Sequence, residues 1–317
     1  MNHKQLGNSG LSLPPIMFGG NVFGWTADEP TSFRLLDHMI TAGLTAIDTA
    51  DMYSSWVPGH QGGESETVIG NYLAQRGGRD QLIIATKVGM MTGADGKKLS
   101  KPTIEAAVDA SLKRLRTDVI DLYQAHADEA ETPLEETLAA FAGLIEQGKV
   151  RAIGASNYTA PRLREALATS ARLGLPRYES LQPHYNLLER PAYEAELEPL
   201  CVAENLGVIN YFALAAGFLT GKYRNEADFA ASPRGEGVKK YLDPKGRRVL
   251  AALDDIAASH RASPAQVAVA WLIARPSITA PIASATSTTQ LDDLIRAATL
   301  TLSPADIATL DRASADH

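Results

Sequence analysis

Short apolar runs alternate along the chain with segments in which apolar residues recur every three or four positions. The eight runs are "PIMFGG" (15–20), "TAIDTA" (45–50), "QLIIATK" (81–87), "VIDLYQAH" (119–126), "VRAIGAS" (150–156), "YESLQPH" (178–184), "GVINYFA" (207–213) and "ITAPIAS" (278–284). They are too short and too continuously apolar to be strands of an antiparallel sheet with one face in water. This pattern predicts strands that are buried on both faces of a parallel sheet.

The segments between the runs have the period of an α-helix. In one of them, Ile104, Val108, Leu112 and Leu115 stand at positions i, i+4, i+8 and i+11, on one helix face. Parallel strands need crossover connections, and a helix after each strand provides them. An open doubly wound sheet is the alternative. Eight regular units in 317 residues favour an α/β protein with a closed (β/α)8 TIM barrel, as a single domain over residues 1–317.

Two segments fall outside this repeat. Residues 4–13 read as two short strands around a turn, so we expect a β-hairpin that closes one end of the barrel. Residues 225–248 are rich in glycine, proline and charge, which predicts a long irregular loop that is a lid, a binding loop or disordered. The glycines of "GGNVFG" (19–24) lack the GxGxxG spacing, which argues against a Rossmann nucleotide domain.

Composition narrows the classes of partner. The formal net charge of -7 and a pI near 5.5 argue against a nucleic acid or an anionic membrane. The single cysteine, Cys201, excludes a disulfide framework and a cysteine-based metal cluster within one chain. No apolar run approaches the roughly 20 residues that would span a bilayer, and the first residues lack the apolar core of a signal peptide. We therefore expect a soluble cytoplasmic protein, and we leave its oligomeric partner open.

Polar side chains stand at the ends of neighbouring runs, where a barrel places its chemistry. Asp48 is in the second run, Lys87 ends the third and His126 ends the fourth. Tyr53 follows Asp48 by five residues. Each has a simpler interpretation alone, Asp48 as a turn residue, for example, and Lys87 as a solvated lysine. Four groups able to exchange or orient protons, on three adjacent strand ends, favour a shared active site.

These four groups suit one kind of chemistry. A tyrosine with a pKa of about 10 is a weak acid at neutral pH unless its phenolate is stabilised. The ammonium group of Lys87 would lower the pKa of Tyr53, and Asp48 would keep Lys87 charged. His126 would donate a hydrogen bond to a substrate oxygen and position it. The set contains no nucleophile and no metal cluster, so a hydride cofactor is needed to supply electrons.

The same residues lie in motifs that resemble those of a known family. The motifs are "FGG" (18–20), "IDTADMY" (47–53), "ESETVIG" (64–70), "ATK" (85–87), "LYQAH" (122–126), "GKVRAIGASNY" (148–158), "LQPHYNLLER" (181–190), "GFLTGKY" (217–223) and "PIASATSTTQLDD" (281–293). In this order and spacing they resemble the aldo-keto reductase superfamily over essentially the whole chain. The most similar subgroup is a bacterial one that also resembles potassium-channel β-subunits.

The resemblance implies a (β/α)8 barrel that reduces carbonyl groups with NADPH or NADH. It assigns Tyr53 as the proton donor, with Lys87 and Asp48 as its charge partners, and His126 as the residue that orients the carbonyl group. The cofactor-binding residues that it implies are Gly20, Asp48, Ser156, Asn157, Gln182, Tyr211, Phe212, Ala213, Leu214, Gly217, Leu219, Lys222, Ser284, Thr286, Gln290 and Asp293. In this set Tyr211 stacks on the nicotinamide ring, and residues 212–217, Leu219 and Lys222 line the pyrophosphate, with 225–248 as a long cofactor-covering loop. Residues 284–293, at a helix N-terminus, hold the adenosine end.

Two departures from the family pattern bear on the choice of cofactor. The family often has Ser-Pro after the stacking tyrosine, where this chain has "FA" (212–213). Many relatives carry Arg or Lys near the eighth strand, where this chain has "SATS" (284–287). Lys222, Arg224 and the basic residues of 225–248 are candidates to compensate. We predict NADPH, with NADH as the alternative.

The insertion "SSWVPGHQGG" (54–63) directly follows Tyr53. Trp56, within it, and Trp25 either form an apolar substrate wall or pack the loop onto the barrel. In the first case they join Tyr53 and His126 around a small carbonyl substrate.

Two further functions remain as alternatives. The chain could be a cofactor-binding regulatory subunit with slow turnover, similar to channel β-subunits. It could also be a lyase or an aldolase that uses Lys87 as a Schiff-base amine. The natural substrate is not predicted, because loops set it and a fold analogy does not.

Overall fold

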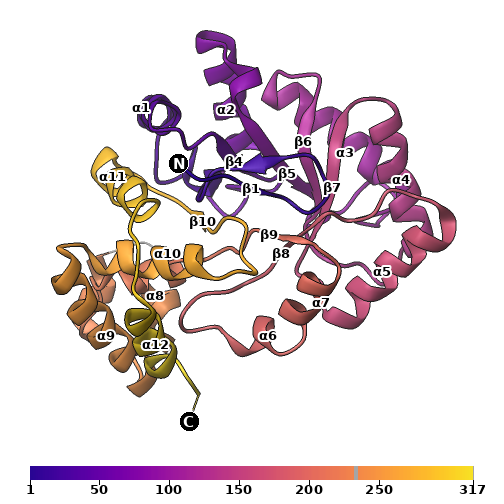
Figure 1. Ribbon diagram of the computed structural model, residues 1–317. Coiled ribbons are helices and arrows are strands. Elements are labelled where there is room, and N and C mark those ends of the chain that lie inside the picture. Colours follow the sequence, from indigo (N-terminus) through magenta and orange to yellow (C-terminus); the bar gives the residue numbers. More distant parts are fainter. Residues whose placement is uncertain (232–234, 317) are drawn as a thin grey trace.

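In the computed structural model, which describes residues 1–231 and 235–316, eight parallel strands form a curled sheet surrounded by helices (Figure 1). The strands are β3 (Met17–Gly19), β4 (Ala46–Asp48), β5 (Ile83–Val88), β6 (Ile120–Ala125), β7 (Val150–Ser156), β8 (Ser180–Gln182), β9 (Gly207–Val208) and β10 (Ile282–Ala283). Each of the eight apolar runs contains one of these strands, as predicted. The order in the sheet is β10-β3-β4-β5-β6-β7-β8-β9, so neighbours in sequence are neighbours in space.

The two end strands of this order meet each other and close the sheet. The amide of Thr279 donates a hydrogen bond of 2.8 Å to the carbonyl of Val208, and the amide of Ile282 donates one of 2.8 Å to the carbonyl of Asn210. These bonds join the chain at β9 to the chain at β10, and a sheet without edges is a barrel. The (β/α)8 fold is therefore confirmed, and the open doubly wound alternative is wrong.

Helices follow the strands and pack on the outside of the barrel. They are α1 (Glu29–Thr41), α2 (Glu64–Arg76), α3 (Lys101–Leu115), α4 (Leu134–Glu146), α5 (Ala160–Leu173), α6 (Pro191–Glu194), α7 (Leu197–Ala203), α8 (Gly235–Val238), α9 (Pro244–His260), α10 (Pro264–Ala274), α11 (Thr288–Ala297) and α12 (Pro304–Ala313). On α3 three residues of the predicted apolar face, Ile104, Val108 and Leu115, are fully covered, and the fourth, Leu112, is partly buried. None of the helices in the described part of the chain is long and apolar enough to span a membrane.

An antiparallel hairpin of β1 (Lys4–Gln5) and β2 (Ser12–Leu13) closes one end of the barrel. Its leucines pack into an apolar cluster with residues that point inward from the strands. The cluster consists of Leu6, Leu11, Leu13, Met17, Ala46, Ala85, Leu122, Ala152, Ile209, Ala280 and Ile282. Met17 and Ala46 are the first residues of their strands, so the hairpin covers the amino ends. The carboxyl ends stay open on the other side.

The segment 225–248 is less irregular than the sequence predicts. It contains the short 3₁₀-helices η4 (Glu226–Ala231) and η5 (Lys239–Tyr241), with α8 between them, and α9 already begins at Pro244. Residues 232–234 lie outside the described part. The helical turns are too short for a periodic apolar face, which is why the sequence pattern did not reveal them.

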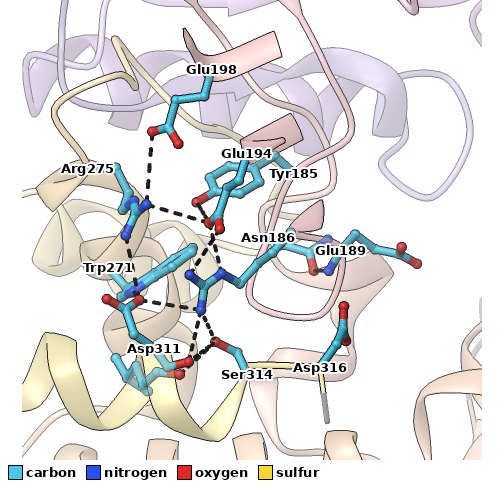
Figure 2. A network of polar contacts seen from close by, with 12 residues as sticks. Tyr185, Asn186, Glu189, Glu194, Glu198, Trp271, Arg275, Asp311, Ser314 and Asp316 are labelled. Atoms are coloured by element: carbon cyan, nitrogen blue, oxygen red, sulfur yellow. Dashed lines mark hydrogen bonds and ion pairs between the residues drawn. The ribbon is translucent and has the colours of Figure 1, made fainter. Parts of the chain in front are cut away.

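A polar network attaches the C-terminal helix α12 to the rest of the barrel. Figure 2 shows Trp271 of α10 beside Arg275 and Asp311, and the indole Nε1 donates a hydrogen bond of 3.0 Å to Asp311 Oδ1. The guanidinium groups of Arg190 and Arg275 lie 5.6 Å and 5.3 Å from the Trp271 ring. Arg190 also donates to the carbonyl of Asp311 at 3.0 Å and to Ser314 Oγ at 2.7 Å. α12 is thus held against α10 and the start of α6.

Candidate active site

The carboxyl ends of the strands surround a cavity of about 810 Å³. Most of the residues predicted for the site line it together. They are Asp48, Tyr53, Trp56, His126, Ser156, Asn157, Gln182, Tyr211, Phe212, Ala213, Leu214, Gly217, Lys222, Ser284, Thr286, Gln290 and Asp293. Strand ends that lie far apart in sequence meet here because the barrel is closed.

Lys87 is buried next to this cavity and its ammonium group has three acceptors. Nζ donates to Asp48 Oδ2 at 2.7 Å, to the carbonyl of Thr49 at 2.8 Å and to the phenol oxygen of Tyr53 at 2.8 Å. An ammonium group has three protons, so each one has a partner. Burial lowers the pKa of Lys87, and the Asp48 carboxylate opposes that effect. The predicted contact among the three side chains is present.

The phenol of Tyr53 lies between a cation and an anion. It accepts from Lys87 and donates to Asp48 Oδ2 at 3.2 Å. Burial raises the pKa of Tyr53 well above its ordinary value, and the Asp48 carboxylate adds to the increase. The expectation that Lys87 gives Tyr53 a lowered pKa was therefore wrong, because burial and the carboxylate outweigh the ammonium group. Tyr53 carries its proton at neutral pH.

Both oxygens of Asp48 are used. Oδ2 accepts from Lys87 and Tyr53, and Oδ1 accepts a hydrogen bond of 2.8 Å from Gln182 Nε2. Gln182 is held in turn by Gln124 Oε1 at 3.4 Å. Because the side chain of Asp48 is only 2% exposed, this carboxylate depends on these donors rather than on water.

His126 lines the same cavity, next to Tyr53. The two ring centroids lie 6.0 Å apart and the rings are inclined by 72°. The His126 amide donates to the carbonyl of Val88 at 2.8 Å, and within the described residues the ring Nδ1 has no partner. Burial, and then the charge of Lys87, lower the pKa of His126 to about 2. The imidazole is therefore neutral at ordinary pH and has one N–H to donate.

Asn157 connects the two sides of the cavity. Its Nδ2 donates to the carbonyl of His126 at 2.9 Å and to Ser156 Oγ at 3.1 Å, and its Oδ1 accepts from Tyr211 OH at 2.8 Å. Its backbone is left-handed, with φ 58°, a conformation that asparagine adopts more readily than most residues. The ring of Tyr211 is thereby fixed relative to the backbone of His126.

One face of the Tyr211 ring is covered by His184. The rings are stacked with centroids 5.1 Å apart and an interplanar angle of 15°, while Tyr211 also lines the cavity. Asn186 Nδ2 donates to the carbonyl of Phe212 at 2.9 Å and holds that residue in a left-handed conformation, with φ 55°. A flat ring supported from behind is a suitable platform for another flat ring.

The loop after Tyr211 turns back on itself through several left-handed residues. Ala215, Ala216 and Gly217 have φ values of 47°, 54° and 99°. Gly217 lies against the end of Lys222, whose Nζ would be 3.4 Å from a Cβ atom at position 217. Among the described residues of the lining, Lys222 is the only lysine or arginine. The amides of Ala215 and Gly217 donate to the carbonyls of Phe212 and Leu214, at 2.8 Å each, so these bonds hold the turn and Lys222 is the group beside it that suits a phosphate.

The far end of the cavity is formed at the start of α11. Ser287 caps this helix through its side chain, and the amide of Thr286 donates to Gln290 Oε1 at 2.9 Å. Ser284 Oγ donates to Asn21 Oδ1 at 2.7 Å, and Asp293 accepts from Gln266 at 2.6 Å. Hydroxyl and amide groups at a helix N-terminus suit a polar or anionic group.

Besides Lys87, which is buried next to the cavity, three predicted residues do not line it. Gly20 is packed where a Cβ atom would lie 3.0 Å from the carbonyl of Asp48, and Leu219 is fully buried in the core. Trp25 contacts the edge of Trp56, with ring centroids 5.4 Å apart, and supports it from outside the lining. These residues act on the cavity wall through their neighbours.

Several lining residues were missed by the sequence analysis. They are Asn21, Val22, Thr26, Met90, Thr220, Ser263, Ala265, Ile282, Ala283 and Leu294. The rule of strand ends could have found Asn21 and Met90, which follow β3 and β5 by two residues. Ser263 and Ala265, at the start of α10, carry no comparable signal in the sequence.

Comparisons with known proteins agree with this geometry. Residues 15–315 match the sequence profile of the Aldo/keto reductase family. The uncharacterized oxidoreductase YrpG of Bacillus subtilis (strain 168) is 34% identical over 310 residues, which are 95% of this chain and 92% of that protein. The L-glyceraldehyde 3-phosphate reductase of Escherichia coli (strain K12) is 30% identical, over 100% of this chain and 93% of its own length. A probable voltage-gated potassium channel subunit beta of Arabidopsis thaliana is 30% identical, over 94% and 91%.

Proposed function

The chain belongs to the aldo/keto reductase family, and from this premise we propose that it reduces a small aldehyde or ketone to an alcohol, with Tyr53 as the proton donor. The observation that carries the proposal is the contact of Tyr53 with Lys87 and Asp48 at the edge of a cavity of about 810 Å³. A nicotinamide cofactor, when bound, would supply the hydride that these side chains cannot.

The residues present fit such a cofactor. Tyr211, supported by His184, offers a ring face for the nicotinamide, with Ser156, Asn157 and Gln182 beside it. Lys222, beside the left-handed turn at 215–217, offers a cation to the pyrophosphate, and the start of α11 offers polar groups to the adenosine end. Along the chain, the groups proposed for the nicotinamide, the pyrophosphate and the adenosine follow the order of these parts in the cofactor.

The proton can be followed from atom to atom. The phenol proton of Tyr53 moves to the substrate oxygen as the carbonyl carbon becomes an alcohol carbon. The oxygen left behind is a phenolate, and the Lys87 ammonium group, 2.8 Å away in the resting site, stabilises it. His126, neutral because of its lowered pKa, donates its N–H to the same substrate oxygen and positions it. A proton from solvent then restores the phenol.

We propose NADPH as the preferred cofactor, with NADH as the alternative. Lys222 lines the cavity and supports the pyrophosphate assignment. Arg224, the second predicted cation, is instead held by both oxygens of Asp254, at 2.8 Å and 2.7 Å, so its charge is already paired. Arg234 lies outside the described residues. If Thr286, Ser287 and nearby basic groups hold the 2′-phosphate, NADPH should give a higher kcat/KM than NADH, and the difference should shrink with added salt.

The test is a turnover assay with purified protein. A panel of aldehydes, ketoses, quinones and a phosphorylated triose is offered with NADPH and then with NADH, and the loss of reduced cofactor is followed by absorbance. We expect saturable turnover with at least one carbonyl class, and a higher kcat/KM with NADPH. Turnover that is absent across the whole panel with both cofactors would contradict the proposal.

The similarity to a channel subunit beta favours one other function, a cofactor-binding regulatory subunit with slow turnover. It predicts tight cofactor binding, measured by fluorescence titration, together with negligible sustained reduction of any carbonyl in the panel. A Schiff-base reaction at Lys87 fits the site less well, because Nζ is fully buried and donates to three oxygens. If treatment with borohydride and a carbonyl compound yields no covalent adduct, the Schiff-base function is excluded. The cytoplasmic location stays a prediction from composition.

A further inference from the structure

A second cavity, of about 380 Å³, lies between α3 and the loop that follows β5. Its walls are largely apolar, with Val88 at one side and Pro102, Ala106 and Ala110 of α3 at another. None of the described residues that line it also lines the first cavity. It is therefore a separate space, and the proposed carbonyl reduction does not use it.

A buried carboxyl group lines this second cavity without a hydrogen-bond donor for one of its oxygens. Asp51 is 5% exposed, and within the described residues its Oδ1 has no partner. A buried acceptor that has given up water without gaining a donor destabilises the folded protein. Oδ1 of Asp51 therefore needs a hydrogen-bond donor, and a ligand in the cavity can supply one.

The charges around Asp51 favour a cationic donor over a neutral one. Burial, and then the carboxylate of Glu66 on α2, raise the pKa of Asp51 to about 7, against the opposing charges of Arg114 and Lys87. Arg114 of α3 lines the cavity, but its Nε is already bonded to Glu66 Oε2 at 2.7 Å. Lys87 of β5 is bonded to Asp48 and Tyr53.

Two more groups complete the electrostatic surroundings. The hydroxyl of Tyr123 on β6 is buried without a partner among the described residues and is close enough to Asp51 to be influenced by its charge. Asp95, exposed in the loop after β5, lines the cavity and adds a second negative charge. The lining thus combines two carboxyl groups, one arginine that is already paired, and an apolar wall of small side chains.

We propose that this second cavity binds a small organic cation, a primary ammonium group on a short apolar stem, with the ammonium group donating to Asp51. The three donors of an ammonium group can serve the free oxygen of Asp51, and the stem would lie against Ala106 and Ala110. A quaternary ammonium group has no N–H and cannot meet this requirement. A neutral alcohol offers one donor but does not relieve the repulsion between Asp51 and Glu66.

The test is a calorimetric titration of the full chain at about pH 8.5, where a carboxyl group with a pKa of about 7 is ionised. The probe is n-butylammonium chloride, with 1-butanol and tetramethylammonium chloride as comparators. We expect saturable binding of n-butylammonium, at least about tenfold tighter than either comparator, since hydrogen bonds to charged groups are the stronger ones. Asp51→Asn should weaken it by at least about tenfold.

Two further variants make the outcome decisive. Ala106→Leu keeps every charge and fills part of the cavity from an exposed position on α3, so it should abolish binding even if Asp51→Asn does not fold. Tyr53→Phe, in the first cavity, should leave n-butylammonium affinity unchanged. Equal binding of 1-butanol, no saturable binding to the wild-type chain, or unchanged affinity in Ala106→Leu would each overturn the proposal. None of these measurements depends on turnover, so their outcome does not affect the proposal that the chain reduces carbonyl groups.

Discussion

The Nζ atom of Lys87 lies 2.8 Å from the phenol oxygen of Tyr53, and the same Nζ lies 2.7 Å from Oδ2 of Asp48. The phenol therefore donates its proton to the carboxylate of Asp48 and accepts a hydrogen bond from the ammonium group of Lys87. The anion and burial hold the proton on the resting phenol, as the raised pKa of Tyr53 indicates. The cation stabilises the oxygen once the proton has moved to a substrate. A proton donor for reduction needs both conditions.

Tyr53→Phe removes one oxygen from this site and little else. If Tyr53 donates the proton, kcat should fall by roughly 10²–10⁴-fold, the usual contribution of a general acid. Cofactor affinity, measured by fluorescence titration, should barely change, because the hydroxyl is not assigned to cofactor binding. Near-normal kcat on a substrate whose chemical step is rate-limiting would contradict the assignment. His126 would then be the next candidate acid.

Lys87→Met should also impair turnover, because the phenolate then forms without a neighbouring cation. The loss in Lys87→Met combined with Tyr53→Phe should not exceed the larger single loss by much, since both residues serve one proton transfer. Lys87→Met also leaves Asp48 buried without its partner, at a cost of about 3–5 kcal/mol in stability. Urea unfolding of each variant separates this effect from the kinetic one. Losses that multiply would show that the two residues act independently.

His126 should make the folded protein less stable in acid. Its pKa is lowered from 6.5 to about 2 on folding, so between these values the unfolded chain binds a proton that the folded chain does not. The free energy of unfolding therefore falls as the pH drops through this window. Asp51, with a pKa raised from 3.8 to about 7, acts in the opposite direction, because its folded form holds the extra proton.

Urea unfolding of His126→Gln and Asp51→Asn across this pH range tests both signs. Relative to the wild type, His126→Gln should lose less stability on going from neutral to acid pH. Asp51→Asn should lose more over the same change. Curves that run parallel to the wild-type curve would mean that neither group changes its proton affinity on folding.

The sequence predicted the fold because the signals for a (β/α)8 barrel are local. Each strand lies within one apolar run, and each helix face follows the period of its own segment. The contact of Asp48, Tyr53 and Lys87 was also predictable, since parallel strands place their carboxyl ends at the same edge. The pairing of β4 with β5 was enough to bring them together.

Properties that depend on distances between distant segments were not predictable. The direction of the Tyr53 pKa shift follows from burial and from the balance of two neighbouring charges, which only the folded structure sets. Arg224 was expected near the cofactor, but Asp254, 30 residues later in sequence, binds it on both oxygens. Ser263 enters the lining because α10 packs beside α11, a contact that neither segment encodes alone.

His184 should support cofactor binding through Tyr211. The two rings are stacked at 5.1 Å, so His184→Ala removes the surface that fixes the Tyr211 ring. Aromatic pairs contribute about 0.5–1.5 kcal/mol, so cofactor affinity should weaken roughly 2- to 10-fold in a fluorescence titration. His184→Phe keeps a stacked ring and should retain most of the affinity. If both variants bind cofactor like the wild type, the stack has no role in binding.

Arg190 should be a major contributor to the attachment of the C-terminal helix. It is largely buried and bonds Glu194 at 2.8 Å, Ser314 Oγ at 2.7 Å and the carbonyl of Asp311 at 3.0 Å. Arg190→Ala leaves these acceptors without their donor, although Arg275 remains 3.5 Å from Glu194 (Figure 2). We expect a loss of about 2–4 kcal/mol in the free energy of unfolding by urea.

The matched control for Arg190→Ala is Arg172→Ala. Arg172 pairs with Glu135 at 2.7 Å, close to the shortest distance that Arg190 makes, but its side chain is 58% exposed. Exposed pairs contribute about 0–1 kcal/mol, so this variant should unfold almost like the wild type. Because both substitutions remove the same chemical group from an ion pair, the difference between them isolates burial. Equal losses would mean that the helix is held by apolar packing alone, and that the network around Trp271 adds no stability of its own.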